Sequence, residues 1–224
     1  MITFIIPTLW KSDKIKGTIE SIIKSDRKDV ELIIIDNLNS NYSTSDPRIT
    51  VVKVKNNIYV NPAWNIGATL ARNEYICLLN DDISLNVDCL LNNFEKFKES
   101  APDFGMIGLH NDNIINGLNS NSINSDNDNL ELEELDCRVY GFGCMMILKK
   151  ANYVQIPNEF KVFFGDDYLY FYNKDLKGRK IYQIKGLKTP GDVSVTSKEF
   201  EDTHMQQEHQ YWDNAIQNLI TKHK

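Results

Sequence analysis

The sequence lacks the cysteine patterns that define disulfide scaffolds and zinc sites. Its 224 residues include four cysteines, with no Cys-x-x-Cys pair and no histidines at zinc-finger spacing. Cys77 lies in an apolar run, and Cys144 lies between small and apolar residues. We interpret the cysteines as buried free thiols, which indicates a reducing, cytoplasmic setting.

Long apolar runs and a basic excess are also missing. No apolar run exceeds five residues, far below the roughly 20 that a membrane-spanning helix needs. The chain opens directly on a strand-like run at residues 2–6, without the charged and then apolar leader of a signal peptide. The formal net charge is −6, which argues against nucleic acid or acidic lipid as a partner. We expect no nucleic-acid binding and no integral membrane segment.

The first half of the chain alternates strand and helix patterns. Short apolar runs predict strands at residues 2–6, 32–35, 49–54, 75–79 and 104–109. Apolar residues at helical spacing predict helices between them, at residues 13–25, 62–70 and 87–99. This alternation predicts an α/β fold with a mostly parallel central sheet flanked by helices, as in Rossmann-like proteins.

The second half is patterned differently. Residues 111–129 contain eight asparagines, which predicts a long polar loop that either covers a binding site or is tolerated surface. Further along the chain, the pattern predicts a strand at 137–149, a helix at 166–177, a strand at 181–185 and a polar helix at 205–222. With no repeat and no clean linker, we expect one domain over residues 1–224.

Three polar clusters follow predicted strands, at Thr8, Asp36 and Asn80-Asp81-Asp82. In parallel sheets, ligands bind outside the carboxyl ends of the strands, so we expect these clusters to share one edge. Asn80-Asp81-Asp82 is the strongest of them, because adjacent carboxylates are the hard oxygen ligands that hold Mg²⁺ or Mn²⁺ on phosphate oxygens. Taken alone, the same turn could be only a helix cap.

In order and spacing, these segments resemble the glycosyltransferase type-A (GT-A) fold, and within it the large inverting family two. The resemblance covers roughly residues 2–172 and rests on Ile5-Ile6-Pro7-Thr8, Ile33-Ile34-Ile35-Asp36-Asn37, Asn65-Ile66-Gly67-Ala68, Leu78-Leu79-Asn80-Asp81-Asp82, Gly141-Phe142-Gly143 and Phe163-Phe164-Gly165-Asp166-Asp167. It implies a nucleotide-sugar-binding half at 1–109 and a smaller acceptor-binding half, which carries the catalytic base, at 110–224.

The resemblance implies roles for the residues that match. Thr8 and Asp36 would contact the base, with Asp36 accepting the N3–H of uracil or thymine, and Asp81 would hold the ribose. Gly143, with Gly141, would let the backbone approach the sugar. The implied set for a UDP- or dTDP-sugar donor is Pro7, Thr8, Leu9, Asp36, Asn65, Asn80, Asp81 and Gly143.

The resemblance also implies a divalent cation, Mn²⁺ or Mg²⁺, that stabilises the departing diphosphate. Asp82 would be its main ligand, because Asn80 stands where many members have the first aspartate. His204 is the best candidate for the late histidine that members often place on the metal. Trp64 replaces a common arginine near the pyrophosphate, and Lys11 could partly supply the missing charge.

Asp166-Asp167 matches the acidic pair that the family places near the acceptor. A carboxylate there would take the proton of the attacking hydroxyl, and we favour Asp167 as this base, with Asp166 second. The alternative is that both aspartates only stabilise a helix N-terminus.

The resemblance, together with these features, implies an inverting, metal-dependent hexosyltransferase that acts on a glycan or another hydroxyl acceptor. A sugar-nucleotide-binding protein without turnover remains an alternative. A nucleotidyltransferase is disfavoured, because Pro7-Thr8-Leu9-Trp10 is not a glycine- and lysine-rich phosphate loop. The Asn-, Ile- and Lys-rich composition is typical of AT-rich genomes and suggests a microbial or viral source, with a host-cytoplasmic location if viral.

Overall fold

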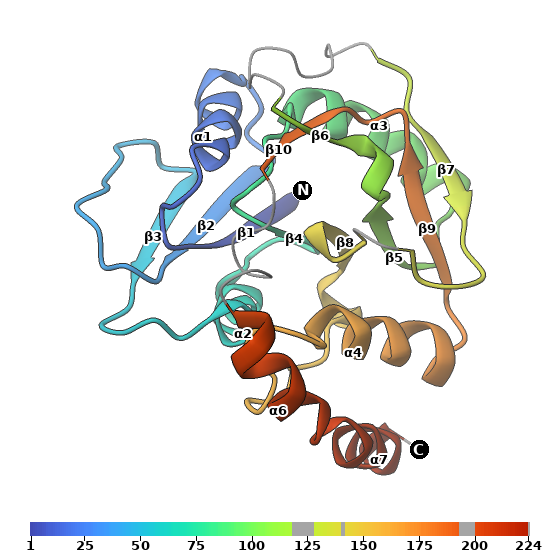
Figure 1. The fold of residues 1–224 in the computed structure, drawn as a ribbon. Coiled ribbons are helices and arrows are strands. Elements are labelled where there is room, and N and C mark those ends of the chain that lie inside the picture. Colours follow the sequence, from blue (N-terminus) through green and yellow to red (C-terminus); the bar gives the residue numbers. More distant parts are fainter. Residues whose placement is uncertain (118–127, 140–141, 193–199, 224) are drawn as a thin grey trace.

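A computed structural model describes residues 1–117, 128–139, 142–192 and 200–223. Its centre is an eight-stranded sheet with the order β3-β2-β1-β4-β8-β5-β9-β7 (Figure 1). The strands are β1 (Ile2–Thr8), β2 (Val30–Asp36), β3 (Ile49–Lys53), β4 (Tyr75–Leu79), β5 (Phe104–Leu109), β7 (Glu131–Glu134), β8 (Met145–Lys149) and β9 (Lys180–Lys185).

The strand directions confirm the predicted α/β class with a mostly parallel sheet. β1, β2, β3 and β4 run parallel to one another, and β5 runs parallel to β9. β8 is antiparallel to both β4 and β5, and β7 is an antiparallel edge strand on β9. The parallel part therefore ends at one edge, where β1, β2 and β4 deliver Thr8, Asp36 and the residues after Leu79.

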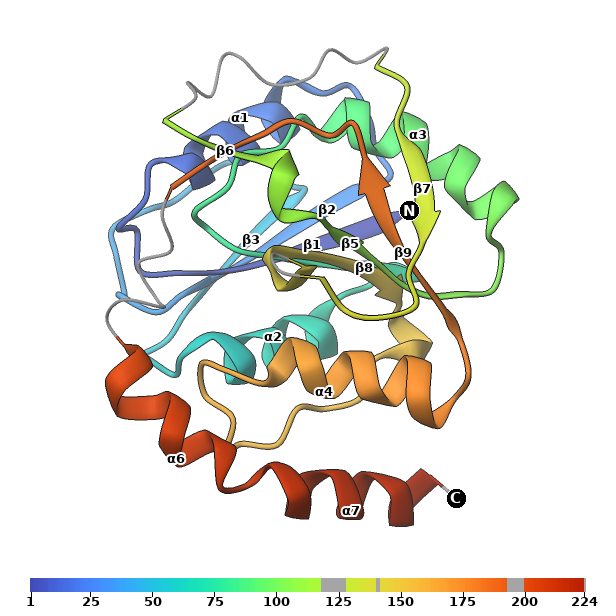
Figure 2. The same ribbon diagram turned by 45° about the vertical axis from the view of Figure 1, so that its right-hand side comes forward.

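Helices cover both faces of the sheet (Figures 1 and 2). On one side lie α1 (Lys14–Lys24) and α3 (Val87–Ser100). On the other lie α2 (Val60–Leu70), α4 (Gly165–Phe171), α6 (Gln206–His209) and α7 (Trp212–His223). Two hydrophobic cores result, one on each face.

The strand β1 shows why its apolar run is continuous. Phe4 and Ile6 face the α1–α3 core, whereas Ile5 faces the α2–α4 core, so every position is buried. On the second face α2 lies so close to β1 that a Cβ on Gly67 would come within 2.2 Å of the Ile5 side chain. Glycine at 67 is thus explained by close packing of the helix on the sheet.

The strand predicted at 137–149 is wrong over its first part. Only Met145–Lys149 forms a strand, and a 3₁₀ turn, η3 (Phe142–Cys144), precedes it. Met145 pairs with Leu79, which is the last residue of β4, so residues before it have no partner on that strand. The chain turns away there, and Gly141 lies outside the described residues.

The final helix is also broken, contrary to the prediction of one helix at 205–222. A π-helical turn, η6 (Glu201–Met205), leads into α6, and a turn at residues 210–211 separates α6 from α7. The break lets buried Glu208 accept hydrogen bonds from the backbone of Val162 and Phe163, while Trp212 packs on Phe160.

The polar segment predicted at 111–129 contains a short strand that the sequence did not reveal. β6 (Ile114–Asn116) pairs in parallel with β10 (Thr189–Gly191), and residues 118–127 lie outside the described part. Among the cysteines, Cys77 and Cys89 are buried free thiols as expected, whereas Cys137 is exposed.

Candidate active site

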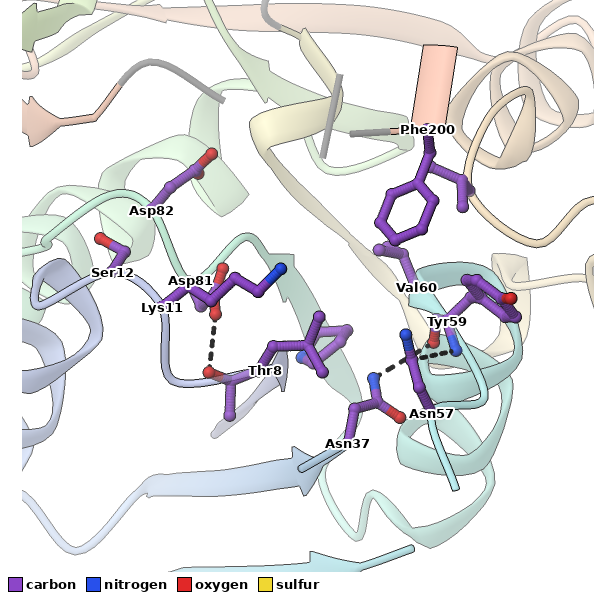
Figure 3. Close-up of a pocket in the computed structure, with 13 residues that line it drawn as sticks. Thr8, Lys11, Ser12, Asn37, Asn57, Tyr59, Val60, Asp81, Asp82 and Phe200 are labelled. Carbon is purple, nitrogen blue, oxygen red and sulfur yellow. Dashed lines mark hydrogen bonds between the residues drawn. The ribbon is translucent and has the colours of Figure 1, made fainter. Parts of the chain in front are cut away.

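A pocket lies at the sheet edge where β1, β2 and β4 end (Figure 3). Asp82 and Ser12 lie on one side of it, and Tyr59, Val60 and Phe200 lie on the other. Its lining consists of Pro7, Thr8, Leu9, Lys11, Ser12, Asn37, Asn57, Tyr59, Val60, Asp81, Asp82, Val162 and Phe200. Five predicted donor or metal residues thus meet at one pocket: Pro7, Thr8, Leu9, Asp81 and Asp82.

Thr8 and Asp81 are joined directly across neighbouring strands. The Thr8 hydroxyl donates to Asp81 Oδ2 at 2.6 Å and accepts from the Trp10 backbone N–H at 2.8 Å. Burial raises the pKa of Asp81, and the hydrogen bond from Thr8 partly offsets that effect. The pair fixes one Asp81 oxygen and orients the carboxylate at the pocket wall.

Asp82 has a buried carboxylate oxygen without a partner. The residue is 7% exposed, and its Oδ1 makes no hydrogen bond within the described structure. Burial, together with the charges of Asp81 and Asp192, raises the pKa of Asp82 to about 7. Because an unpaired buried carboxylate is costly, this oxygen is well suited to a bound cation.

The small β6–β10 sheet holds the Asp82 loop in place. Ser84 N–H donates to Pro190 O, and Asp192 N–H donates to Asp82 O, each at 2.9 Å. Asp192 in turn accepts from the Ser12 hydroxyl at 2.5 Å.

No group of three or more acidic, histidine or cysteine side chains that could hold a metal is found among the described residues.

Asp36 is fully enclosed and does not line the pocket, whereas its neighbour Asn37 does. Its carboxylate accepts from Leu38 N–H at 3.1 Å and from both the N–H and the hydroxyl of Ser40 at 2.7 Å. Burial alone would raise the pKa of Asp36, but these hydrogen bonds outweigh it and hold the pKa below its usual value. Recognition of a base N3–H by Asp36 requires this buried carboxylate to become accessible from the pocket, and it stays a prediction.

Replacing Asp36 with alanine tests this role. We expect the affinity for a uridine or thymidine nucleotide to fall by about 1–3 kcal/mol, the cost of losing a hydrogen bond to a charged group. The metal requirement should hardly change, because Asp82 is untouched. Calorimetric titration with UDP measures both, and wild-type affinity in a folded variant would exclude Asp36 from base recognition.

Three other predicted donor residues lie outside the pocket lining. Asn65 uses its amide to hold the segment after β8: it donates to Ile156 O at 2.8 Å and accepts from the Tyr153 hydroxyl at 2.7 Å. The Asn80 backbone N–H donates to Cys144 O at 3.0 Å, which ties the Asn80–Asp82 turn to β8. Gly143 lies against Asp166. Their contact with a donor stays a prediction.

His204 lies on the Phe200 side of the pocket. Its ring packs on Tyr59 with a centroid distance of 5.1 Å and on Phe200 at 5.4 Å. Its Nδ1 is 3.8 Å from Glu208 Oε1. Because Phe200 and Asp82 line opposite sides of the pocket (Figure 3), a shared ion would have to draw His204 across it. The metal role of His204 stays a prediction.

The acidic pair begins the helix α4 and is bound by an arginine. Arg138 Nη1 lies 2.7 Å from Asp166 Oδ2, and Arg138 Nε lies 2.6 Å from Asp167 Oδ1. The pKa of Asp167 is raised to about 6, because burial and the Asp166 charge raise it more than the opposing effect of Arg138 lowers it. Asp167 is therefore mostly ionised at neutral pH and can accept a proton.

Sequence reasoning missed Arg138 and most of the far wall of the pocket. Asn57, Tyr59, Val162 and Phe200 line that wall, and none belongs to a block that carried the resemblance. Of the two departures noted in the sequence, Trp64 is buried in the core on the α2 face, and Lys11 lines the pocket.

The fold and site together define a type-A glycosyltransferase fold, and solved structures share it. S. aureus TarS 1–349 in complex with UDP-GlcNAc matches 89% of this chain and 61% of its own, with 14% identity and a TM-score of 0.63. Mannosyltransferase PcManGT from Pyrobaculum calidifontis, in complex with GDP-Man and Mn²⁺, matches 95% and 64%, with 13% identity and a TM-score of 0.63. The chain thus spans about three fifths of the length of these two solved chains.

The family follows from the sequence match. Residues 3–153, more than half of the chain, match the family model of glycosyl transferase family 2, so the chain belongs to glycosyl transferase family 2. A search of curated proteins finds no match to it. Within the described residues, no helix has both the length and the apolar character needed to cross a bilayer.

Proposed function

We propose that this protein transfers a sugar from a nucleotide-sugar donor to an acceptor hydroxyl, with inversion and with the help of a divalent cation. The observation that carries the proposal is the unpartnered, buried Asp82 oxygen in a pocket that also holds the Thr8–Asp81 pair. Family membership supports glycosyl transfer. Structural relatives with UDP-GlcNAc and with GDP-Man and Mn²⁺ support the donor class and the metal.

The residues divide between the two ends of the reaction. Asp82 would hold Mn²⁺ or Mg²⁺, which when bound neutralises charge on the departing diphosphate. Asp81 and Thr8 would hold the ribose and base side of a UDP- or dTDP-sugar. On the acceptor side, Asp167 would take the proton of the acceptor hydroxyl. At the same time the acceptor oxygen would bond to the anomeric carbon of the donor sugar, and the bond from that carbon to the diphosphate would break.

The raised pKa of Asp167 agrees with its assignment as the catalytic base. A carboxyl with a pKa near 6 is charged above that pH and can accept the proton, whereas below it the group is protonated and inactive. A pKa between the usual value for aspartate and neutral pH also makes it a stronger base than a solvent-exposed aspartate. The acceptor would be a glycan or another hydroxyl compound, bound by the half at 110–224.

A thermal-shift screen of UDP-, dTDP- and GDP-sugars, each with and without Mn²⁺, tests the proposal. We expect a uridine or thymidine sugar to raise the melting temperature only when the cation is present, because Asp82 reaches the diphosphate through it. Absence of any donor-dependent shift with either Mn²⁺ or Mg²⁺ would contradict the proposal. A shift with GDP-sugars alone would show that the donor nucleotide carries guanine and not uracil or thymine.

A sugar-nucleotide-binding protein without turnover is the second candidate. The hydrogen bonds from Ser40 to Asp36 favour it, because they put a carboxylate expected to recognise the base into an internal contact. A glycosyltransferase releases free nucleoside diphosphate from the donor that it binds, whereas a binding protein without turnover does not, so this release distinguishes the two candidates.

The buried free thiols Cys77 and Cys89 support the expected reducing setting.

A further inference from the structure

We propose that Arg138 is a positioning residue for the acidic pair: its guanidinium fixes Asp166 and keeps Asp167 charged, which leaves the second Asp167 oxygen to take the acceptor proton. The catalytic part of this inference rests on the proposed function. The electrostatic part concerns the folded protein alone and can be measured without a substrate.

Each carboxylate contacts a different nitrogen of the Arg138 guanidinium. Nη1 contacts Asp166 Oδ2 at 2.7 Å and Nε contacts Asp167 Oδ1 at 2.6 Å, so one side chain bridges two adjacent acids. Arg138 comes from the segment between β7 and η3, whereas the acids begin α4. This bridge joins two segments that the sequence separates by nearly thirty residues.

Gly143 also lies against the Asp166 carboxylate. A Cβ at position 143 would lie 2.4 Å from Asp166 Oδ2 and 2.8 Å from its carboxyl carbon, closer than any side chain allows. Asp166 is therefore held between the Gly143 backbone and Arg138, and its side chain is 22% exposed. Asp167 is less enclosed, with a side chain 32% exposed, and in the described structure only Oδ1 meets the arginine. Asp167 is thus the member of the pair that remains available to a substrate.

The charges around the pair explain why an arginine is needed there. Two carboxylates on consecutive residues at a partly buried helix start repel each other, and the neutral form of one becomes favoured. Among the titratable neighbours, Cys144 from η3 interacts electrostatically with Asp82 and Asp166, and Tyr170 interacts with Arg138; burial is the main cause that raises the pKa of each to about 12, so both stay neutral. Arg138 is the cation that contacts both acids, and arginine stays charged at every relevant pH.

Carbon-13 NMR of aspartate carboxyl groups tests the electrostatic part directly. The Asp167 signal is assigned by its absence in Asp167→Asn. In Arg138→Gln, we expect the Asp167 titration midpoint to rise by roughly 1–3 pH units, the usual effect of removing an adjacent opposite charge. In Asp166→Asn, we expect it to fall, because a like charge is removed. Shifts in opposite directions are not produced by general loosening of the fold.

Arg138→Lys separates charge from geometry. A lysine keeps one positive charge but lacks the planar fork that reaches both acids, so we expect a midpoint between those of wild type and Arg138→Gln. Arg72→Gln is the matched control: Arg72 pairs with Glu31 and does not contact the acidic pair, so its loss should not move Asp167. An unmoved Asp167 midpoint in folded Arg138→Gln would overturn the inference.

The pH dependence of turnover tests the catalytic part. If Asp167 is the base, the acidic limb of kcat should move upward in Arg138→Gln and downward in Asp166→Asn, in step with the NMR midpoints. If the Asp167 titration midpoint moves but the acidic limb of kcat does not, the link between Arg138 and catalysis is refuted. If wild type turns over no donor, the proposed function fails, and the NMR titration still decides whether Arg138 controls the pair.

Discussion

Replacing Asp167 with asparagine is expected to lower turnover by roughly 10²–10⁴-fold while donor affinity stays at the wild-type level. A general base acts on the acceptor proton only, so its loss affects the chemical step and not the binding of the nucleotide sugar. Asparagine keeps the shape of the side chain and an oxygen for the Arg138 Nε–H, but it cannot take the proton. Transfer or donor hydrolysis at saturating donor measures the effect.

The same variant separates the base from the helix-capping alternative. If the acids only stabilise the α4 N-terminus, Asp167→Asn should lower the melting temperature slightly and leave turnover near normal. The matched control is Asp166→Asn, which removes the acid that Arg138 and Gly143 enclose. Activity within a few-fold of wild type for Asp167→Asn would pass the role to Asp166, and harmless effects in both would refute the acidic-pair mechanism.

Replacing Asp82 with alanine is expected to abolish metal-dependent nucleotide binding without unfolding the protein. Asp82 Oδ1 has no partner in the described structure, and the neighbouring Asp81 charge repels it, so its removal costs no internal hydrogen bond at that atom. The melting temperature measured without metal should therefore not fall. Calorimetric titration of UDP in the presence of Mn²⁺ measures the binding loss.

A surface aspartate provides the control for Asp82. Asp13 is exposed at the start of α1 and pairs with Lys16 on the surface, so Asp13→Ala should bind UDP with Mn²⁺ as wild type does. Unchanged affinity in Asp82→Ala would remove Asp82 from the metal site. Loss of binding in both variants would show that net charge, rather than a specific ligand, governs the metal dependence.

The sequence was sufficient for the parallel part of the sheet and for the position of the pocket. The run Ile33–Ile35 predicted a strand buried on both faces, and Ile34 indeed packs in one core while Ile33 and Ile35 pack in the other. Once the strands are parallel, their carboxyl ends share an edge, and Thr8 must approach the residues after Leu79. Local pattern and topology therefore placed Thr8, Asp81 and Asp82 together.

Local pattern was insufficient where a contact joins distant segments. A glycine- and methionine-rich stretch reads as one strand from 137, yet its strand begins only at Met145, because β4 ends opposite that residue. The helix expected at 205–222 divides so that Glu208 can reach the 162–163 backbone. In both places, the partner that decided the structure lies far away in the chain.

By itself, then, the sequence determined the α/β class, the edge at which ligands meet and the acids available there, because these follow from hydrophobic periodicity and strand direction. Tertiary structure alone decided how each acid is used. It enclosed Asp36 with Ser40, left Asp82 Oδ1 without a partner and brought Arg138 onto Asp166 and Asp167. The physical reason is that burial and long-range ion pairing set the charge and availability of a carboxylate, and neither is encoded in the spacing of residues along the chain.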